Sequence, residues 1–69
     1  MNEYKKLVQA EETCYTIEVR EKATDKEGVA NTYEHGVHVF YGAQDGSDDK
    51  TISPEDFSRD FKITAEIAN

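Results

Sequence analysis

Residues 13–21 alternate between apolar and polar side chains, which is typical of a β-strand with one face in the core. The run is also rich in β-branched and aromatic residues, which favour strands. We expect the segment that follows, residues 22–31, to be a loop, because it is polar and contains Asp25 and Gly28. The residues on the predicted core face of the strand are Tyr15, Ile17 and Val19.

A second strand is predicted over residues 32–42, where the same alternation returns. Gly36 lies inside this run, and a glycine within a strand often marks a bend or a bulge. The opposite, more exposed face of this strand carries His38 and Phe40. The residues expected to face the core are Tyr33, Val37, Val39 and Tyr41.

The remaining segments of the chain predict secondary structure with different clarity. Residues 51–53 fit either a short strand or the approach to the next element. In the first ten residues, Tyr4, Leu7 and Val8 fit the apolar stripe of a helix, but the segment also fits an edge strand, which we favour. The clear alternation of residues 61–67 predicts a third strand, with one face formed by Phe61, Ile63, Ala65 and Ile67.

These elements predict an α+β fold dominated by β-structure. It consists of a small antiparallel sheet of three to five strands and one short helix near residues 54–60. With 69 residues in all, the chain is expected to form a single domain over residues 1–69. So little helix leaves part of the sheet uncovered, and dimerisation or docking to a partner is one way to hide it.

The segment ISPEDF has the residue order of a helix N-terminus. Ser53 is the expected N-cap, and Pro54 is the first helical residue, where its missing N–H costs nothing. Asp56 stands at the third position and completes a weaker form of the capping box. Ile52 before the cap and Phe57 at the fourth position fit a hydrophobic staple. The sequence therefore predicts a helix that begins at the proline.

The overlapping residues 45–56 resemble the calcium loop of the EF-hand family, whose oxygen ligands occupy six fixed positions. The resemblance implies a calcium site, but Lys50 stands where the family has a glycine, and an aspartate replaces the last, bidentate glutamate. We favour the helix start and expect neither a metal nor another cofactor. The residues at the six ligand positions are Asp45, Ser47, Asp49, Thr51, Ser53 and Asp56.

Other candidate chemistry is sparse. His35 and His38 have the spacing of a metal pair on a helix, but on a strand this odd spacing sends them to opposite faces. Cys14 is the one cysteine, so no internal disulfide can form, and it lies inside a strand pattern that gives no reason for a reactive thiolate. Because glycine-rich phosphate loops and nucleophile elbows are also absent from the sequence, we expect the protein not to be an enzyme.

The net charge indicates which partners the protein can bind, and the N-terminal sequence and apolar runs indicate its cellular location. The net charge is −7, and residues 29–69 carry eight acidic against three basic residues. Such a chain repels the phosphates of nucleic acids, so direct DNA or RNA binding is not expected. The sequence has neither a signal-peptide core nor an apolar run that would span a membrane, and the single cysteine suits a reducing compartment. We therefore expect a cytoplasmic protein without membrane contact.

The sequence favours a non-enzymatic protein-interaction module that binds a basic protein surface. An acidic surface of this kind could mimic nucleic-acid phosphates and block a nucleic-acid-binding protein, as small acidic inhibitors of phages and mobile elements do. The alternatives are a calcium-binding module and a small structural or oligomerising subunit, and a homodimer is compatible with each. The residues predicted to contact the partner are Asp45, Asp48, Asp49, Glu55, Asp56, Asp60 and Phe40.

Overall fold

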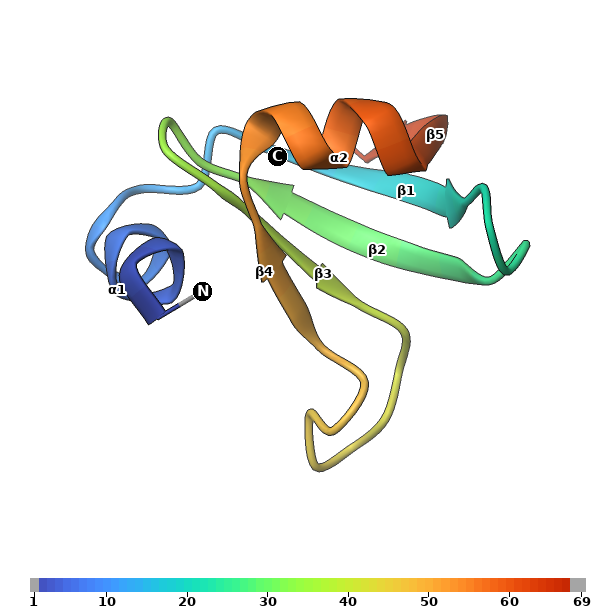
Figure 1. The fold of residues 1–69 in the computed structure, drawn as a ribbon, viewed down its shortest axis with the longest axis horizontal. Coiled ribbons are helices and arrows are strands. Elements are labelled where there is room, and N and C mark those ends of the chain that lie inside the picture. Colours follow the sequence, from blue (N-terminus) through green and yellow to red (C-terminus); the bar gives the residue numbers. More distant parts are fainter. Residues whose placement is uncertain (1, 68–69) are drawn as a thin grey trace.

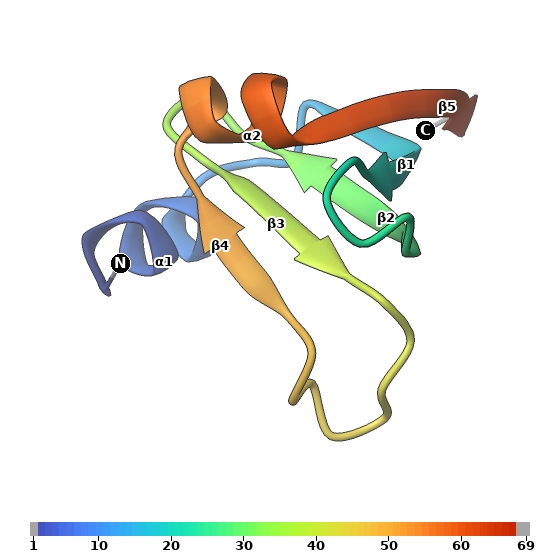
Figure 2. The same cartoon turned by 45° about the vertical axis from the view of Figure 1, so that its right-hand side comes forward.

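The computed structural model describes residues 2–67 and contains one five-stranded antiparallel sheet with two helices (Figures 1 and 2). The strand order is β4-β3-β2-β1-β5, so β4 and β5 are the edge strands of this sheet. The predicted β-dominated α+β class is confirmed. Met1 and residues 68–69 of the predicted domain lie outside the described residues. In chain order the elements are α1 (Asn2–Ala10), β1 (Tyr15–Glu21), β2 (Glu27–Thr32), β3 (Val37–Phe40), β4 (Lys50–Ile52), α2 (Pro54–Asp60) and β5 (Phe61–Ile67).

The centre of the core is a row of three side chains across the middle strands. Ile17 on β1 lies opposite Ala30 on β2, which lies opposite Val39 on β3. Residues that face each other across antiparallel strands share one face of the sheet, and all three are buried. Helix α2 covers this face with Phe57, whose ring stacks on that of Phe61 at a centroid distance of 5.3 Å. The core is therefore one sheet face under two turns of helix.

The two helices contact different parts of the sheet. In Figure 1, α2 lies above the sheet, and α1 lies beside β4 at the other end. Helix α1 packs against β3 and β4. A cleft between α1 and the sheet is lined by Lys5 of α1 and by His38 and Thr51. His38 and Thr51 lie on the sheet face opposite to that of Val37 and Val39. The structure thus has a helix on each face of the sheet.

The predicted strand in the first ten residues is wrong, because residues 2–10 form α1. Val8 is only 2% exposed and docks against Gly36, where an added Cβ would lie 2.7 Å from a methyl group of Val8. Gly36 belongs to the β2–β3 turn, far along the chain. The helical stripe was therefore the correct interpretation, and the contact that selects it is not local.

The predicted loop over residues 22–31 is also wrong, because β2 begins at Glu27. Correspondingly, residues 32–42 form the end of β2, a turn and then β3, rather than one strand. Strand β2 is hard to recognise because its core face carries the small residues Gly28 and Ala30. A side chain at Gly28 would meet the Phe40 carbonyl oxygen at 2.8 Å and the Tyr41 ring at 3.0 Å, so small residues are required there.

Strand β5 was predicted correctly, but its alternation was not. Val19 pairs with Ile63 and Glu18 pairs with Ala65, so Thr64 is an extra residue that forms a β-bulge. Beyond the bulge the facing of the side chains is reversed. Phe61 and Ile63 therefore lie on the core face, whereas Ala65 and Ile67 lie on the opposite one.

The expected core residue Tyr15 is 59% exposed, because it lies at the start of β1 beside a groove that α2 leaves open. Tyr33 and Tyr41 are half-buried, and Tyr41 packs against the edge of the core cluster. Of the two alternatives for residues 51–53, the short strand is the one found, as β4 over Lys50–Ile52, and α2 matches the predicted helix over 54–60. Ser53 caps α2 as expected, since its hydroxyl oxygen accepts a hydrogen bond from the Asp56 N–H at 3.2 Å.

Candidate interaction surface

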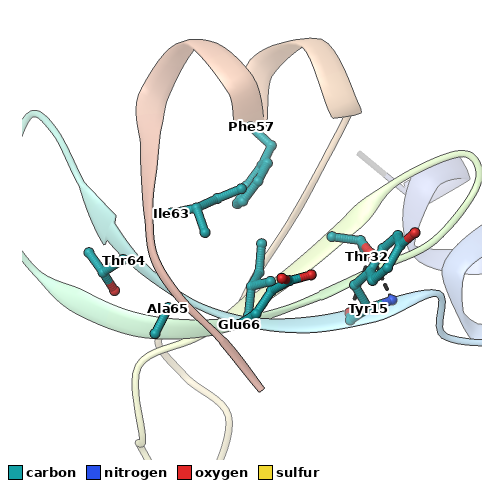
Figure 3. Close-up of a pocket in the computed structure, with 8 residues that line it drawn as sticks. Tyr15, Thr32, Phe57, Ile63, Thr64, Ala65 and Glu66 are labelled. Atoms are coloured by element: carbon teal, nitrogen blue, oxygen red, sulfur yellow. Dashed lines mark hydrogen bonds between the residues drawn. The ribbon is translucent and has the colours of Figure 1, made fainter. Parts of the chain in front are cut away.

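An apolar groove of about 510 Å³ opens between α2 and the ends of β1 and β5 (Figure 3). In Figure 3, Phe57 points down from the helix toward Ile63. Tyr15 and Thr32 lie on the opposite side of Glu66 from Ile63 (Figure 3). Tyr15 is 59% exposed and Ile63 is 56% exposed. The residues that line the groove are Tyr15, Ile17, Thr32, Phe57, Ile63, Thr64, Ala65 and Glu66.

The groove follows from the length of α2 and the bulge in β5. Helix α2 has seven residues and buries Phe57, so the sheet beyond that side chain is left uncovered. Because of the bulge, Ile63 and Thr64 both line the groove, and Glu66 follows them on the same side. At the far end, the backbone N–H of Tyr15 donates a hydrogen bond to the Thr32 hydroxyl at 3.0 Å, which fixes the start of β1.

Three predicted contact residues, Asp45, Asp48 and Asp49, lie together in the β3–β4 loop and are called the acidic loop here. Each has a partner inside the protein. Asp45 accepts a hydrogen bond from the Ser47 N–H at 2.9 Å, and this bond lowers the pKa of its carboxyl group. Asp48 lies 3.5 Å from the Lys26 ammonium, and Asp49 lies 3.1 Å from the His38 ring.

The acidic loop is anchored to the sheet by Tyr41. The Tyr41 hydroxyl donates to Glu21 at 2.9 Å, and the Lys50 ammonium donates to the same carboxylate at 2.9 Å. The bond from Lys50 is the main reason why the pKa of Glu21 is lowered, whereas burial raises the pKa of Tyr41. Lys26, the partner of Asp48, also lies 4.6 Å above the centre of the Tyr41 ring. These contacts connect the loop to β1 and to the β1–β2 turn.

The remaining predicted carboxylates, Glu55, Asp56 and Asp60, belong to α2 and are called the acidic helix group here. Arg59 bridges two of them, with its guanidinium 3.2 Å from Asp56 and 2.8 Å from Asp60. The hydrogen bond from Arg59 lowers the pKa of Asp60. β4 separates this group from the acidic loop, and Figure 2 shows the loop and the helix at opposite ends of that strand. The six carboxylates therefore form two groups.

The six positions of the calcium-loop pattern are spread over the acidic loop, β4 and the start of α2. Thr51 is buried in β4, and the Ser53 hydroxyl caps the helix. Among residues 2–67, the group of three Asp, Glu, His or Cys side chains with ligand atoms within 4.8 Å of one another is elsewhere, at Glu11, Glu34 and His35.

Sequence reasoning missed the contact between Glu11 and His35. The Glu11 carboxylate lies in hydrogen-bonding contact with the His35 ring Nδ1 and accepts from the His35 backbone N–H at 3.3 Å. The ring contact lowers the pKa of Glu11 and raises that of His35. It joins the end of α1 to the β2–β3 turn across 24 positions, and no local pattern links such distant residues.

Phe40 and the two histidines do not form a common site with the groove. Phe40 is half-buried, and its ring contacts that of His38 edge-on at a centroid distance of 5.2 Å. Phe40 pairs with Val29 on the sheet face opposite the core. His35 and His38 have separate carboxylate partners, and Cys14 is exposed next to β1.

The surface therefore combines an apolar groove with two separate acidic groups. Neither α1 nor α2 reaches the length and apolarity that a helix needs to cross a bilayer. Comparison with known proteins finds no family model that matches the chain, and neither a curated sequence nor a solved structure with significant similarity to it.

Proposed function

We propose that this protein is a non-enzymatic interaction module that binds a basic surface of a partner protein through the acidic loop and the acidic helix group. The observation that carries the proposal is the charge of residues 45–60, where six acidic residues stand against Lys50 and Arg59. These acidic residues follow each other closely in sequence and lie at the two ends of one strand. Such an arrangement offers two points of attachment to one basic partner.

The internal ion pairs of these carboxylates do not remove their capacity to bind. An ionised carboxylate has about four acceptor sites, and a single lysine or histidine contact uses one of them. Surface pairs of this kind contribute little to stability, so exchanging them for pairs with a partner costs little. Complementary charge mainly accelerates association and selects the partner. A nucleic-acid-binding protein, whose lysines and arginines normally meet phosphates, is the partner class that fits best.

The proposal is tested with an oligolysine peptide as the probe. We expect binding at low salt that weakens by about tenfold or more in several hundred millimolar salt, because exposed charges are then screened. Neutralising the acidic loop by Asp45→Asn, Asp48→Asn and Asp49→Asn should weaken binding at low salt relative to the unchanged protein. Asparagine keeps the turn, since its side-chain oxygen still accepts from the Ser47 N–H.

The matched control removes the same amount of charge elsewhere, by Glu12→Gln, Glu18→Gln and Glu27→Gln. If the two triple variants lose affinity equally, net charge alone accounts for binding and the assignment to the acidic loop is wrong. Affinity that is independent of salt would refute the electrostatic function altogether. If the acidic surface also mimics nucleic-acid phosphates, the protein should displace a fluorescent DNA duplex that is already bound to the oligolysine peptide.

A further inference from the structure

We infer that the groove between α2 and β5 is a docking site for the apolar side chains of an extended, basic segment of the partner. This inference rests on the proposed function and adds to it a second, apolar contact. The acidic groups attract the partner, and the groove determines which segment of it is held.

The groove has the size and lining of a binding site. Its volume of about 510 Å³ lies in the range of about 300–1,000 Å³ that is usual for ligand pockets. Tyr15 and Ile63 are large apolar side chains with more than half of their surface exposed, and both line it. Phe57, at the inner wall, belongs to the buried core, so this wall is held in place by core packing. Apolar anchors that enter such a pocket contribute most of the binding energy at protein interfaces.

The charge of the groove's surroundings selects a basic occupant. Glu66 is the one charged side chain among the eight lining residues. Helix α2, whose Phe57 lines the groove, carries three acidic residues against Arg59 and contributes to the protein's net charge of −7. A second copy of this chain would bring another net charge of −7 and be repelled. An apolar segment flanked by lysine or arginine is complementary to the apolar lining, to Glu66 and to the protein's net negative charge.

The position of β5 favours an extended occupant. β5 is the last strand in the order of the described sheet, and it pairs with β1 on one side. The outer N–H and C=O groups of an edge strand can pair with an added strand. A segment added there could place its apolar side chains on the groove side, next to Ile63, and leave the basic side chains between them toward solvent, where the protein's net charge of −7 attracts them. Alternation of apolar and basic residues is therefore the predicted sequence pattern of the partner segment.

The experiment uses three short peptides with the full chain: lysine alternating with leucine, lysine alternating with serine, and glutamate alternating with leucine. Backbone amide shifts are measured by NMR. We expect the lysine–leucine peptide to bind about tenfold more tightly than the lysine–serine peptide, with shifts at residues 15–17, 57 and 63–66. The glutamate–leucine peptide should bind least. Each comparison isolates one property of the segment, first the apolar side chains and then the charge.

Two matched variants on β5 locate the contact. Ile63→Ser removes an exposed isoleucine from the groove, whereas Ile67→Ser removes an isoleucine from the opposite face of the same strand, where it is 40% exposed. Both changes are at exposed positions, so both variants should fold. We expect Ile63→Ser to lower the affinity for the lysine–leucine peptide by about tenfold and Ile67→Ser to change it by less than about twofold.

The outcomes separate this inference from the proposed function. Equal binding of the two lysine peptides, with shifts limited to the acidic loop and the acidic helix group, would overturn the groove and leave the charged interaction intact. Tight binding of the glutamate–leucine peptide would overturn the basic occupant. Concentration-dependent shifts at residues 63–66 without peptide, together with a dimer in sedimentation, would assign the groove to a second copy. Absence of binding by any of the peptides would refute the docking site and the proposed function together.

Discussion

The two helices differ in how they are held. Helix α2 begins at Ser53, whose side chain caps it, and it sends Phe57 into the core. Helix α1 is attached by residues that contact a distant turn, Val8 at Gly36 and Glu11 at His35. Its exposed apolar residues, Tyr4 and Leu7, contribute less. Helix α2 is specified by its local sequence, whereas α1 depends on the sheet having formed.

This difference predicts how the protein tolerates change. Damage to α2 should remove the cover of the main core, because the ring of Phe57 lies against Phe61 and the central strands. Damage to α1 should release this helix from β3 and β4 and leave the core in place.

Phe57→Ala should have the largest effect. Truncation of a buried phenylalanine costs about 3–5 kcal/mol, which is a large part of the stability of a small domain. The free energy of unfolding is measured by urea denaturation followed by far-UV circular dichroism.

Phe57→Leu, which keeps most of the side-chain volume, should cost about 1 kcal/mol and keeps the test valid if the alanine variant does not fold. Leu7→Ala on the exposed side of α1 serves as the control and should change stability by less than about 0.5 kcal/mol. Equal effects of Phe57→Ala and Leu7→Ala would contradict the comparison.

The contact between α1 and the β2–β3 turn should be the next most sensitive. Val8→Ala should cost about 2 kcal/mol through the lost burial of two carbons, and Gly36→Ala about 1–3 kcal/mol, because the added Cβ collides with Val8. The double variant should cost less than the sum, since the Cβ then fills the space of the lost methyl groups. A double-mutant cycle in urea measures this coupling. Simple additivity would show that the two residues do not contact each other.

The sequence revealed elements whose signals are local. Residues 13–21 and 61–67 alternate, and ISPEDF contains a cap, a proline and an acidic first turn, so β1, β5 and α2 were all predicted. Strand β2 was missed, because Gly28 and Ala30 look like loop residues until the close approach of Phe40 and Tyr41 is known. A strand with small residues on its core face has a weak periodic signal.

The candidate site was less predictable than the fold. The six acidic positions were evident from composition, but their division into two groups depends on where β4 lies. The groove was not foreseen at all, because the predicted face of Phe61, Ile63, Ala65 and Ile67 ignored the bulge at Thr64. A one-residue insertion in the pairing reverses the facing of every later side chain. The signal that was present is Tyr15, an aromatic residue at the first position of β1.

The cap of α2 gives a smaller and more local effect. Ser53→Ala should cost about 1 kcal/mol, because the Asp56 N–H loses its acceptor at the helix start. Ser53→Asp, which restores an acceptor, should recover most of this loss. The matched control is Ser58→Ala, an exposed serine within the same helix, which should be neutral or slightly stabilising. All three variants are compared by urea denaturation. A cost at Ser58 that equals the cost at Ser53 would mean that the hydroxyl does not act as a cap.

The smallest expected effect is a pH dependence of α1. Contact with Glu11 raises the pKa of His35, so this contribution is fully present below the ordinary histidine value of about 6.5 and is lost as pH rises through the raised value. The lowered pKa of Glu11 acts in the other direction, since its contribution is present above the ordinary glutamate value of about 4.3 and is lost as pH falls through the lowered value. Attachment of α1 should thus be strongest between about pH 4.3 and 6.5.

Hydrogen exchange of the α1 amides measures this attachment, with rates corrected for intrinsic pH dependence. His35→Gln should flatten the profile, whereas His38→Gln, whose ring contacts Asp49 instead, should leave it unchanged. A profile that responds to His38→Gln and not to His35→Gln would place the attachment of α1 at the β3–β4 loop rather than at the β2–β3 turn.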